Sequence, residues 1–133
     1  MNKFYVLVLI IASLLTTTGR AGELASSFKQ AAALGDAQEK DPATWVYQRR
    51  DLTPYYEQKY RPVFQSCLKS TNHPDTSSFS FVVVIGKDGR VMRLYIDHDT
   101  TVYTCVRQTL QEDEFPRPPV SPYYWHVEMS FAK

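Results

Sequence analysis

The sequence predicts an α+β fold in which a small antiparallel three-stranded sheet has two helices packed on one face. Residues 79–97 alternate apolar and polar side chains on both sides of a glycine-containing turn, which is the pattern of a β-hairpin. Residues 123–131 alternate in the same way and predict a third strand. One segment before the hairpin and one after it carry apolar stripes at helical spacing. The elements therefore follow the order α-β-β-α-β, after an N-terminal helical leader.

The leader is predicted from residues 22–34, which are rich in helix-forming side chains. Its apolar stripe consists of Leu24, Phe28, Ala31 and Ala32. Gly35 stands where such a helix would end, and the polar residues 36–43 predict a linker. Residues 45–47, Trp-Val-Tyr, fit either a short strand or a packing anchor.

The first helix of the sheet domain is expected to begin at Thr53, whose hydroxyl suits an N-cap and is followed by Pro54 at the first helical position. Pro62 removes a backbone donor, so we expect the helix to kink or restart there. Its apolar face beyond that point consists of Val63, Phe64, Cys67 and Leu68. Residues 70–78 are rich in turn formers and predict the loop into the hairpin.

The hairpin has an apolar first strand, a Gly-Lys-Asp-Gly turn and a second strand that alternates. The alternating apolar residues are Phe79, Phe81, Val83 and Ile85, then Met92, Leu94 and Ile96. Gly86 and Gly89 supply the backbone freedom that a tight hairpin turn requires, so the two strands should be antiparallel neighbours. Because the first strand is apolar at nearly every position, we expect it at the centre of the sheet.

A second helix is expected after the hairpin, with Asp99, Thr100 or Thr101 as its N-cap. Its apolar stripe consists of Val102, Cys105, Val106, Thr109 and Leu110. Residues 115–119, FPRPP, should be extended, because a residue before proline is kept out of the α region. In the last strand one face is formed by Tyr123, Trp125, Val127, Met129 and Phe131.

The chain contains two cysteines, Cys67 and Cys105. In an exported protein such a pair usually forms a disulfide, and two buried free thiols are the alternative. Two helices side by side on one sheet face would bring the buried stripes that carry these residues together. We therefore expect a Cys67–Cys105 disulfide, and closing that loop would contribute about 4 kcal/mol in the chain-entropy model.

Residues 1–21 have the pattern of a secretory signal peptide, with a basic start, an apolar run and small residues before a cleavage site at Ala21. The apolar run, residues 4–15, is shorter than the roughly 20 residues of a membrane span. We therefore expect cleavage after Ala21, localisation in the periplasm and no stable membrane anchor. The predicted division is 1–21 signal peptide, 22–52 helical leader and linker, and 53–133 sheet domain.

The charge balance argues against a nucleic-acid-binding protein. Lys3 and Arg20 are the basic residues of the signal segment, which leaves 13 of the 15 basic residues against 14 acidic ones. Nucleic-acid-binding domains are usually markedly basic. We therefore expect the partner to be another protein.

Four segments occur in a familiar order. They are the hairpin VVVIGKDGRVMRLYI, the helix VYTCVRQTL, the segment FPRPP and the closing aromatic strand. With these segments, residues 60–131 resemble the TonB C-terminal domain family, including the branch often called AgmX/PglI C-terminal-like. The positions of Cys67 and Cys105 resemble a cysteine pair of that branch, one on each helix.

The resemblance implies a small sheet whose exposed edge pairs with an extended segment of another protein. TonB itself also has an uncleaved membrane helix with a coupling histidine and a long proline-rich spacer. Here the apolar run is short and has no histidine, and residues 21–61 contain only Pro42 and Pro54. The resemblance therefore implies a stand-alone periplasmic form, without the membrane anchor or energy-coupling segment.

Two histidine-containing patterns are candidates for chemical sites. His126 and Glu128 share a strand face and would need a third ligand to hold a metal. The run Asp97-His98-Asp99 lies where a strand passes into a helix, and Asp99 suits an N-cap there. We therefore expect no catalytic residues, no metal and no cofactor.

The aromatic side chains exceed what one face of a three-stranded sheet can bury. They include Tyr55, Tyr56, Tyr60, Tyr123, Tyr124 and Trp125. Either the leader covers them, or they form a protein-binding surface, since Tyr and Trp are enriched at interfaces. The last strand is the candidate edge for strand addition, because residues 123–131 contain no proline or lysine. The candidate partner-binding residues are Tyr123, Tyr124, Trp125, His126 and Glu128.

The function predicted from the sequence is that of a non-catalytic periplasmic protein-binding module. The alternative is a periplasmic immunity or inhibitor protein that neutralises a toxin or an enzyme.

Overall fold

The computed structural model describes residues 23–132 and shows the α+β fold that the sequence predicts. The elements are, in chain order, α1 (Phe28–Lys40), α2 (Pro42–Tyr47), the π-helix η1 (Gln48–Leu52), α3 (Thr53–Ser70), β1 (Phe79–Ile85), β2 (Val91–Ile96), α4 (Thr101–Gln111) and β3 (Tyr123–Met129). The predicted signal peptide, residues 1–21, lies outside the described residues. Within residues 23–132, no helix is long and apolar enough to cross a membrane.

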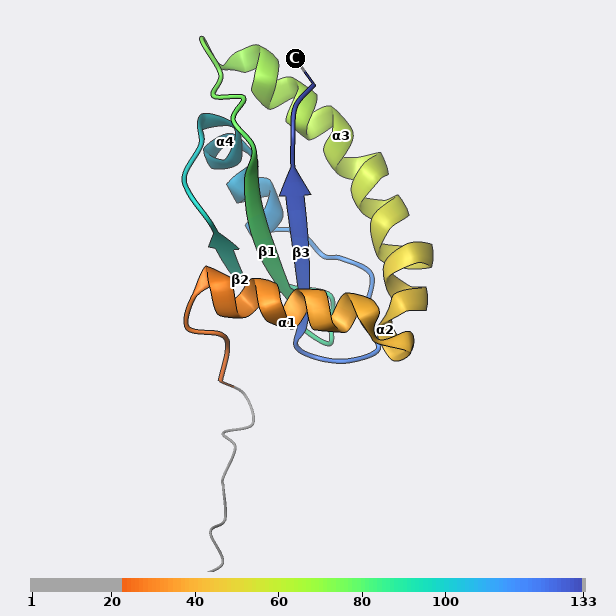
Figure 1. Ribbon diagram of the computed structural model, residues 1–133. Coiled ribbons are helices and arrows are strands. Elements are labelled where there is room, and N and C mark those ends of the chain that lie inside the picture. The colour runs from red at the N-terminus through yellow and green to blue at the C-terminus, as the bar shows by residue number, and fades with distance from the viewer. Residues whose placement is uncertain (1–22, 133) are drawn as a thin grey trace, which may run out of the picture.

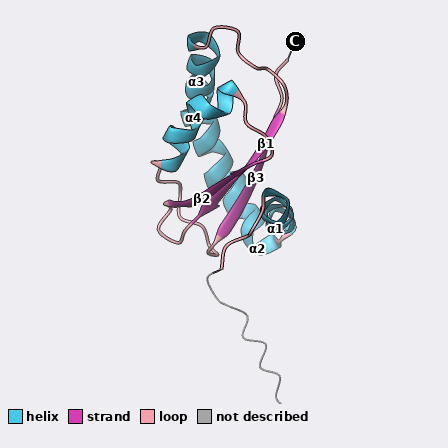
Figure 2. Cartoon of the chain, turned by 90° about the vertical axis from the view of Figure 1, so that its left-hand side faces the viewer, coloured by secondary structure: helices cyan, strands magenta, loops and turns pink. Residues whose placement is uncertain are grey.

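The sheet has the strand order β2-β1-β3 with both pairs antiparallel, so β1 is the central strand, as predicted. The pairing of β1 with β3 runs from Phe79↔Met129 to Ile85↔Tyr123. The helices α3 and α4 lie on one face of the sheet, while α1 crosses the other (Figures 1 and 2). The leader therefore adds a second covering layer to the predicted architecture.

Each face of the sheet has its own hydrophobic core. The main core, under α3 and α4, includes Tyr60, Phe64, Phe79, Phe81, Val83, Ile85, Val102, Val106, Leu110, Tyr123 and Trp125. The smaller core, under α1, consists of Ala25, Ala31, Ala32, Val82, Val84, Tyr95 and Tyr124. Because successive residues of a strand point to opposite faces, β1 serves both cores, which explains its nearly continuous apolar sequence.

The helix α1 continues through Gly35 to Lys40, so the predicted end at Gly35 is wrong. A Cβ atom at Gly35 would lie 3.0 Å from the carbonyl oxygen of Tyr124 and 3.1 Å from the Cβ of His126. The glycine therefore permits the close approach of α1 to β3, and it does not end the helix. At the start of α1, the Ser27 hydroxyl accepts a hydrogen bond from the amide of Gln30 at 3.2 Å.

Gly35→Val is expected to lower the free energy of unfolding by about 2 kcal/mol, because its side chain would press into the backbone of β3. Ala33→Val, at an exposed position of the same helix, is the matched control and should cost less than about 1 kcal/mol. Urea denaturation of both variants measures the difference. Equal losses in the two variants would mean that α1 does not pack on β3 through Gly35.

The predicted linker, residues 36–43, is wrong because the chain stays helical through most of it. Asp41 separates α1 from α2, and its Oδ1 accepts a hydrogen bond from the amide of Ala43 at 2.9 Å. Pro42 then occupies the first turn of α2. Residues 45–47 are thus helical rather than a strand, and Tyr47 is a packing anchor, 5 % exposed.

Thr53 is not an N-cap, because one helical segment runs from α2 through η1 into α3. The Thr53 amide donates to the carbonyl of Gln48, five residues earlier, which is π-helical pairing. This wider turn comes directly before Pro54. Proline has no backbone N–H, and the hydrogen bond that it cannot donate falls where π-helical hydrogen bonding changes to α-helical hydrogen bonding. Pro62 lies inside α3, which continues past it.

The start of α4 and, at Gly89, the hairpin turn follow the predicted chemistry, whereas Gly86 does not have a positive φ. Gly89 has a φ of +89°, and a Cβ there would lie 2.1 Å from the carbonyl oxygen of Phe115. The Phe115 amide donates to the carbonyl of Gly89 at 2.8 Å. Of the three candidate caps of α4, it is Thr100 whose hydroxyl accepts from the amide of Tyr103, at 3.0 Å.

Cys67 and Cys105 form the predicted disulfide, with their Cα atoms 5.8 Å apart, and it joins α3 to α4. Cys67 is buried, but Cys105 is on the exposed side of α4, so the expectation of two buried stripes is wrong for Cys105. The helices α3 and α4 lie side by side, and the disulfide connects their adjacent sides. A disulfide fits an oxidising compartment.

Candidate functional site

Three of the predicted partner-binding residues are core residues. Tyr123, Tyr124 and Trp125 are only 0 %, 4 % and 6 % exposed. The ring of Tyr123 packs edge-on against Tyr47 at 5.2 Å, and that of Trp125 against Tyr56 at 4.7 Å. The helices therefore cover both faces of β3, which corrects the prediction that these three side chains contact a partner.

The first half of the outer edge of β3 is occupied by α1. The Tyr124 amide donates to Oε1 of Gln38 at 2.7 Å, and Nε2 of Gln38 donates to the carbonyl of Pro122 at 3.1 Å. One side chain thus makes hydrogen bonds of the kind that a neighbouring strand would make. Gly35 lies beside the next position, where a Cβ would be 3.2 Å from the His126 amide nitrogen. The leader therefore prevents an added strand from pairing along the full length of β3 in this structure.

His126 and Glu128 do not form a metal site. Nδ1 of His126 lies 2.8 Å from Oδ1 of Asp36, and its ring packs edge-on against Phe28 at 5.8 Å. Glu128 is exposed and lines a shallow hollow with Asp97 at the far end of this sheet face. In the described part of the chain, no three His, Cys, Asp or Glu side chains are grouped closely enough to hold a metal.

The Asp97-His98-Asp99 run lies at the exposed turn before α4. Nδ1 of His98 is 3.0 Å from Oδ1 of Asp97. Thr100, and not Asp99, makes the cap hydrogen bond at the start of α4. The run therefore shapes a turn at the surface.

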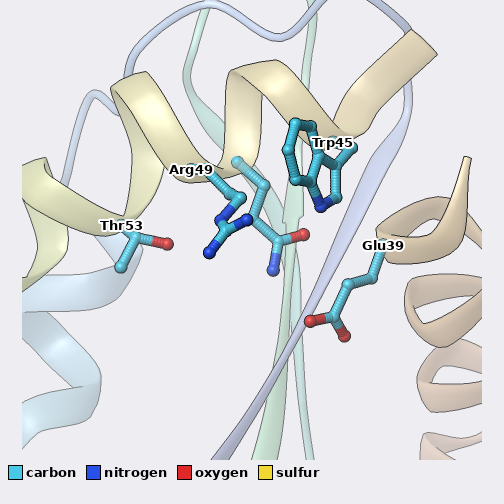
Figure 3. A pocket seen from close by; sticks show the side chains of 5 residues that line it. Glu39, Trp45, Arg49 and Thr53 are labelled. Carbon is cyan, nitrogen blue, oxygen red and sulfur yellow. The ribbon is translucent and has the colours of Figure 1, made fainter. Parts of the chain in front are cut away.

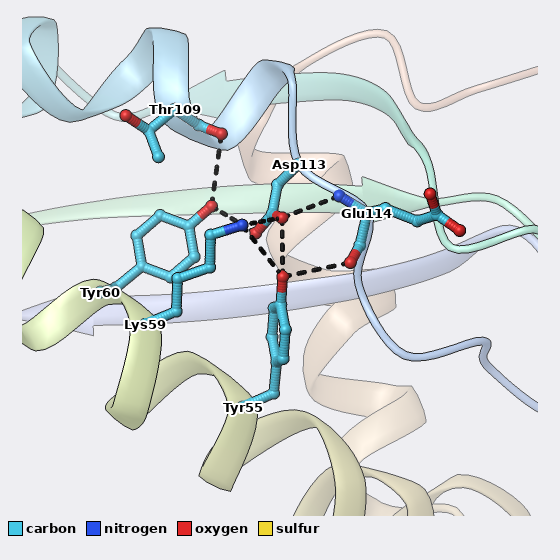
Figure 4. Close-up of polar contacts among 6 residues, drawn as sticks. All are labelled: Tyr55, Lys59, Tyr60, Thr109, Asp113 and Glu114. Carbon is cyan, nitrogen blue, oxygen red and sulfur yellow. Dashed lines mark hydrogen bonds and ion pairs between the residues drawn. The ribbon is translucent and has the colours of Figure 1, made fainter.

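Asp113 is a buried carboxylate that sequence reasoning did not single out (Figure 4). The Tyr60 hydroxyl donates to its Oδ2 at 2.6 Å, and the Tyr55 hydroxyl donates to its Oδ1 at 2.7 Å. The Lys59 ammonium forms a close ion pair with Oδ1, which also accepts from the amide of Glu114 at 2.8 Å. These donors satisfy the carboxylate and fasten α3 to the segment that follows α4.

The electrostatics of this cluster fix its protonation. Burial acts to raise the pKa of Asp113, but hydrogen bonds from Lys59, Tyr60 and Tyr55 outweigh it and hold that pKa below its usual range. Burial, together with the hydrogen bond to Asp113, raises the pKa of Tyr60 far above its ordinary value. At neutral pH the carboxylate is therefore charged and the tyrosines are donors. We assign a structural role to this cluster.

A different surface is suited to contact another molecule. Trp45 on α2 is 48 % exposed, and its neighbour Val46 is 47 % exposed. The guanidinium carbon of Arg49 lies 4.8 Å from the centroid of the Trp45 ring. Glu39 of α1 and Thr53 of α3 help to line a hollow of about 350 Å³ beside this pair (Figure 3). We call Trp45, Val46 and Arg49 the Trp45 surface.

The local structure explains why these side chains face outward. Thr44 and Tyr47, on either side of them, are 1 % and 5 % exposed. The Thr44 hydroxyl donates to the carbonyl of Gln38, and the Tyr47 hydroxyl donates to the carbonyl of Pro116 at 2.7 Å. With both of these residues turned inward, the helical geometry turns Trp45 and Val46 to the solvent. The Trp45 surface therefore lies on a helix that is held in place by the buried, hydrogen-bonded Thr44 and Tyr47.

Sequence reasoning missed both groups for identifiable reasons. The sequence of residues 45–47 fits a strand or a packing anchor equally, and the exposure of each side chain can be assigned only once these residues are known to be helical. Asp113 lies in the acidic run of residues 112–114 directly after α4, and nothing in the local sequence distinguishes it from Glu112 and Glu114. The available signal was on α3, where Tyr55, Lys59 and Tyr60 share one helical face.

The structure is a small α+β domain with an internal disulfide and with helices on both faces of its sheet. Comparisons with protein-family models, curated proteins and solved structures found no match for this chain.

Proposed function

We propose that this chain is a non-catalytic protein-binding module of the periplasm and that the Trp45 surface contacts its partner. The proposal keeps the protein-binding function implied by the resemblance to the TonB C-terminal domain family. It moves the contact from β3, whose edge is half occupied by α1, to α2 and η1.

The observation that carries this proposal is the exposed Trp45 with Arg49 stacked on it. Trp and Arg are enriched among the interface residues that contribute most to binding. A stacked guanidinium still has donors in its plane, which suit a carboxylate. The expected partner is therefore a protein with an apolar side chain that covers Trp45 and an acidic side chain that pairs with Arg49.

The compartment is supported by two separate features. The Cys67–Cys105 disulfide fits an oxidising environment. The signal-peptide pattern of residues 1–21 supports export, which is the second argument for the periplasm.

A periplasmic immunity or inhibitor protein is the second candidate, and the fixed setting of Trp45 favours it. The residues beside Trp45, Thr44 and Tyr47, are buried and hydrogen-bonded, so the surface needs little rearrangement to bind. Preformed interfaces of this kind are typical of inhibitor complexes. The identity of the partner separates the two candidates, since an inhibitor would retain a toxin or an enzyme.

Trp45→Ala is expected to weaken partner binding about 30-fold or more, which is the effect of losing an interface hot spot of about 2 kcal/mol. Periplasmic extract is passed over immobilised wild-type protein, Trp45→Ala and Gln58→Ala, and retained proteins are quantified by mass spectrometry. Gln58 is an exposed position on α3 and serves as the control.

The expected result is a protein retained by the wild type and Gln58→Ala but not by Trp45→Ala, with equal thermal stability of all three forms. Its affinity is then measured directly by titration. Equal retention by all three forms would show that the Trp45 surface is not the contact.

A further inference from the structure

The strand β2 forms the other edge of the sheet, and Figure 2 looks toward it. Only the start of this edge is paired, because Arg90 and Glu114 form an isolated antiparallel bridge. Beyond Arg90, no strand of residues 23–132 pairs with the outer side of β2. An unpaired edge of this kind is a template for another strand.

The direction of the backbone groups can be read from one hydrogen bond. The Asp97 amide donates to the carbonyl of Ser80 on β1 at 3.1 Å, so the backbone of Asp97 faces β1. Because backbone groups alternate in direction along a strand, Leu94 and Ile96 turn theirs to the outer side. Both residues can therefore exchange hydrogen bonds with an added strand.

The charged side chains along the β2 edge are placed so that two copies of the chain can pair opposite charges. Arg93 is exposed on the α1 face, with its guanidinium carbon 5.0 Å from the Tyr95 ring centroid, and the exposed Asp97 lies on the same face beyond Tyr95. Two antiparallel copies related by a two-fold axis at Tyr95 would place Arg93 of each opposite Asp97 of the other. The same register sets Leu94 opposite Ile96, with their outward backbone groups facing each other.

We infer that β2 is a self-association edge, through which two copies pair antiparallel about a two-fold axis at Tyr95. The two three-stranded sheets become one continuous sheet. A second copy fits better than an unrelated strand, because the opposite charges of Arg93 and Asp97 lie symmetrically about Tyr95. This inference goes beyond the proposed function: α2 lies on the β3 side of the sheet (Figure 1), so the dimer leaves both Trp45 surfaces free.

Charge reversal tests the register. Wild-type protein should show a monomer–dimer equilibrium in sedimentation velocity over a concentration series. Arg93→Asp alone sets Asp against Asp, and Asp97→Arg alone sets Arg against Arg, so each variant should dimerise at least 10-fold more weakly. An equimolar mixture of the two variants restores both opposite-charge pairs and should dimerise like the wild type. Both positions are exposed, so the variants are expected to stay folded.

Wild-type protein that stays monomeric up to its solubility limit would overturn the inference. So would single variants that dimerise like the wild type, or a mixture that does not recover. Hydrogen exchange of the wild type gives a test without substitutions. The amides of Leu94 and Ile96 should exchange more slowly at high than at low protein concentration, while the Tyr95 amide, which faces β1, should not change. Concentration-independent exchange at Leu94 and Ile96 would also overturn the inference.

Discussion

Replacing Asp113 with alanine is expected to lower the free energy of unfolding by about 3 kcal/mol. The change leaves the buried Tyr60 hydroxyl without its carboxylate partner and removes the ion pair with Lys59. The loss lies at the lower end of the range for a broken buried pair, because Lys59 is partly exposed and can turn to water. Urea denaturation of the purified protein measures it.

The matched control is Glu112→Ala, which removes an exposed carboxylate next to Asp113. It should change the free energy of unfolding by less than about 0.5 kcal/mol. A loss of similar size in both variants, or a loss below about 1 kcal/mol for Asp113→Ala, would contradict the role assigned to the cluster.

The same cluster predicts a pH dependence. The pKa of Asp113 is lower in the folded chain than its usual value, which in unfolded chains is about 3.9. Its contribution to stability is therefore fully present above that unfolded value and is lost as the pH falls through the folded pKa. Wild-type protein should lose more stability between about pH 5 and pH 3 than Asp113→Asn does. Parallel pH profiles of the two proteins would contradict this.

Removing the disulfide is expected to have the other large effect, about 4 kcal/mol of unfolding free energy for a loop that spans 38 residues. The variant Cys67→Ala with Cys105→Ala tests this, again by urea denaturation. Stability is lost mainly because the unfolded chain gains conformational freedom when the bridge is removed. The folded form of the variant should therefore keep its circular dichroism spectrum.

Reduction of the wild type provides the independent control. Because Cys105 is exposed, a reductant can reach the bridge in the folded protein, and reduced wild type should match the double variant in stability. A double variant as stable as the oxidised wild type would mean that the bridge does not constrain the unfolded chain.

The parts of the fold that depend on local chemistry could be predicted from the sequence. The hairpin followed from alternation and from Gly89, whose positive φ the turn requires. The α4 cap came from a short run that contained Thr100. The Cys67–Cys105 pair followed from two helices that share one sheet face.

The parts that depend on long-range contacts could not be predicted. Gly35 has the local signature of a helix end, but its conformation is decided by β3, which follows about 90 residues later. The aromatic residues of β3 fitted either a surface covered by the leader or an exposed binding surface, and the sequence could not decide, because their burial by α1 and α3 is a tertiary effect. The burial of Asp113 depends likewise on where α3 lies, although Tyr55, Lys59 and Tyr60 share one face of that helix, and the Trp45 surface depends on residues 45–47 being helical.

Crosslinking at the Trp45 surface tests the proposed function most directly. A photoreactive phenylalanine analogue is placed at position 46, next to Trp45, or at position 58 on α3 as the control, and exported protein is illuminated in the source cells. The account predicts a discrete adduct with another protein from position 46, none from position 58, and loss of the adduct when Arg49→Ala is added. No adduct from position 46, or the same adducts from both positions, would contradict it.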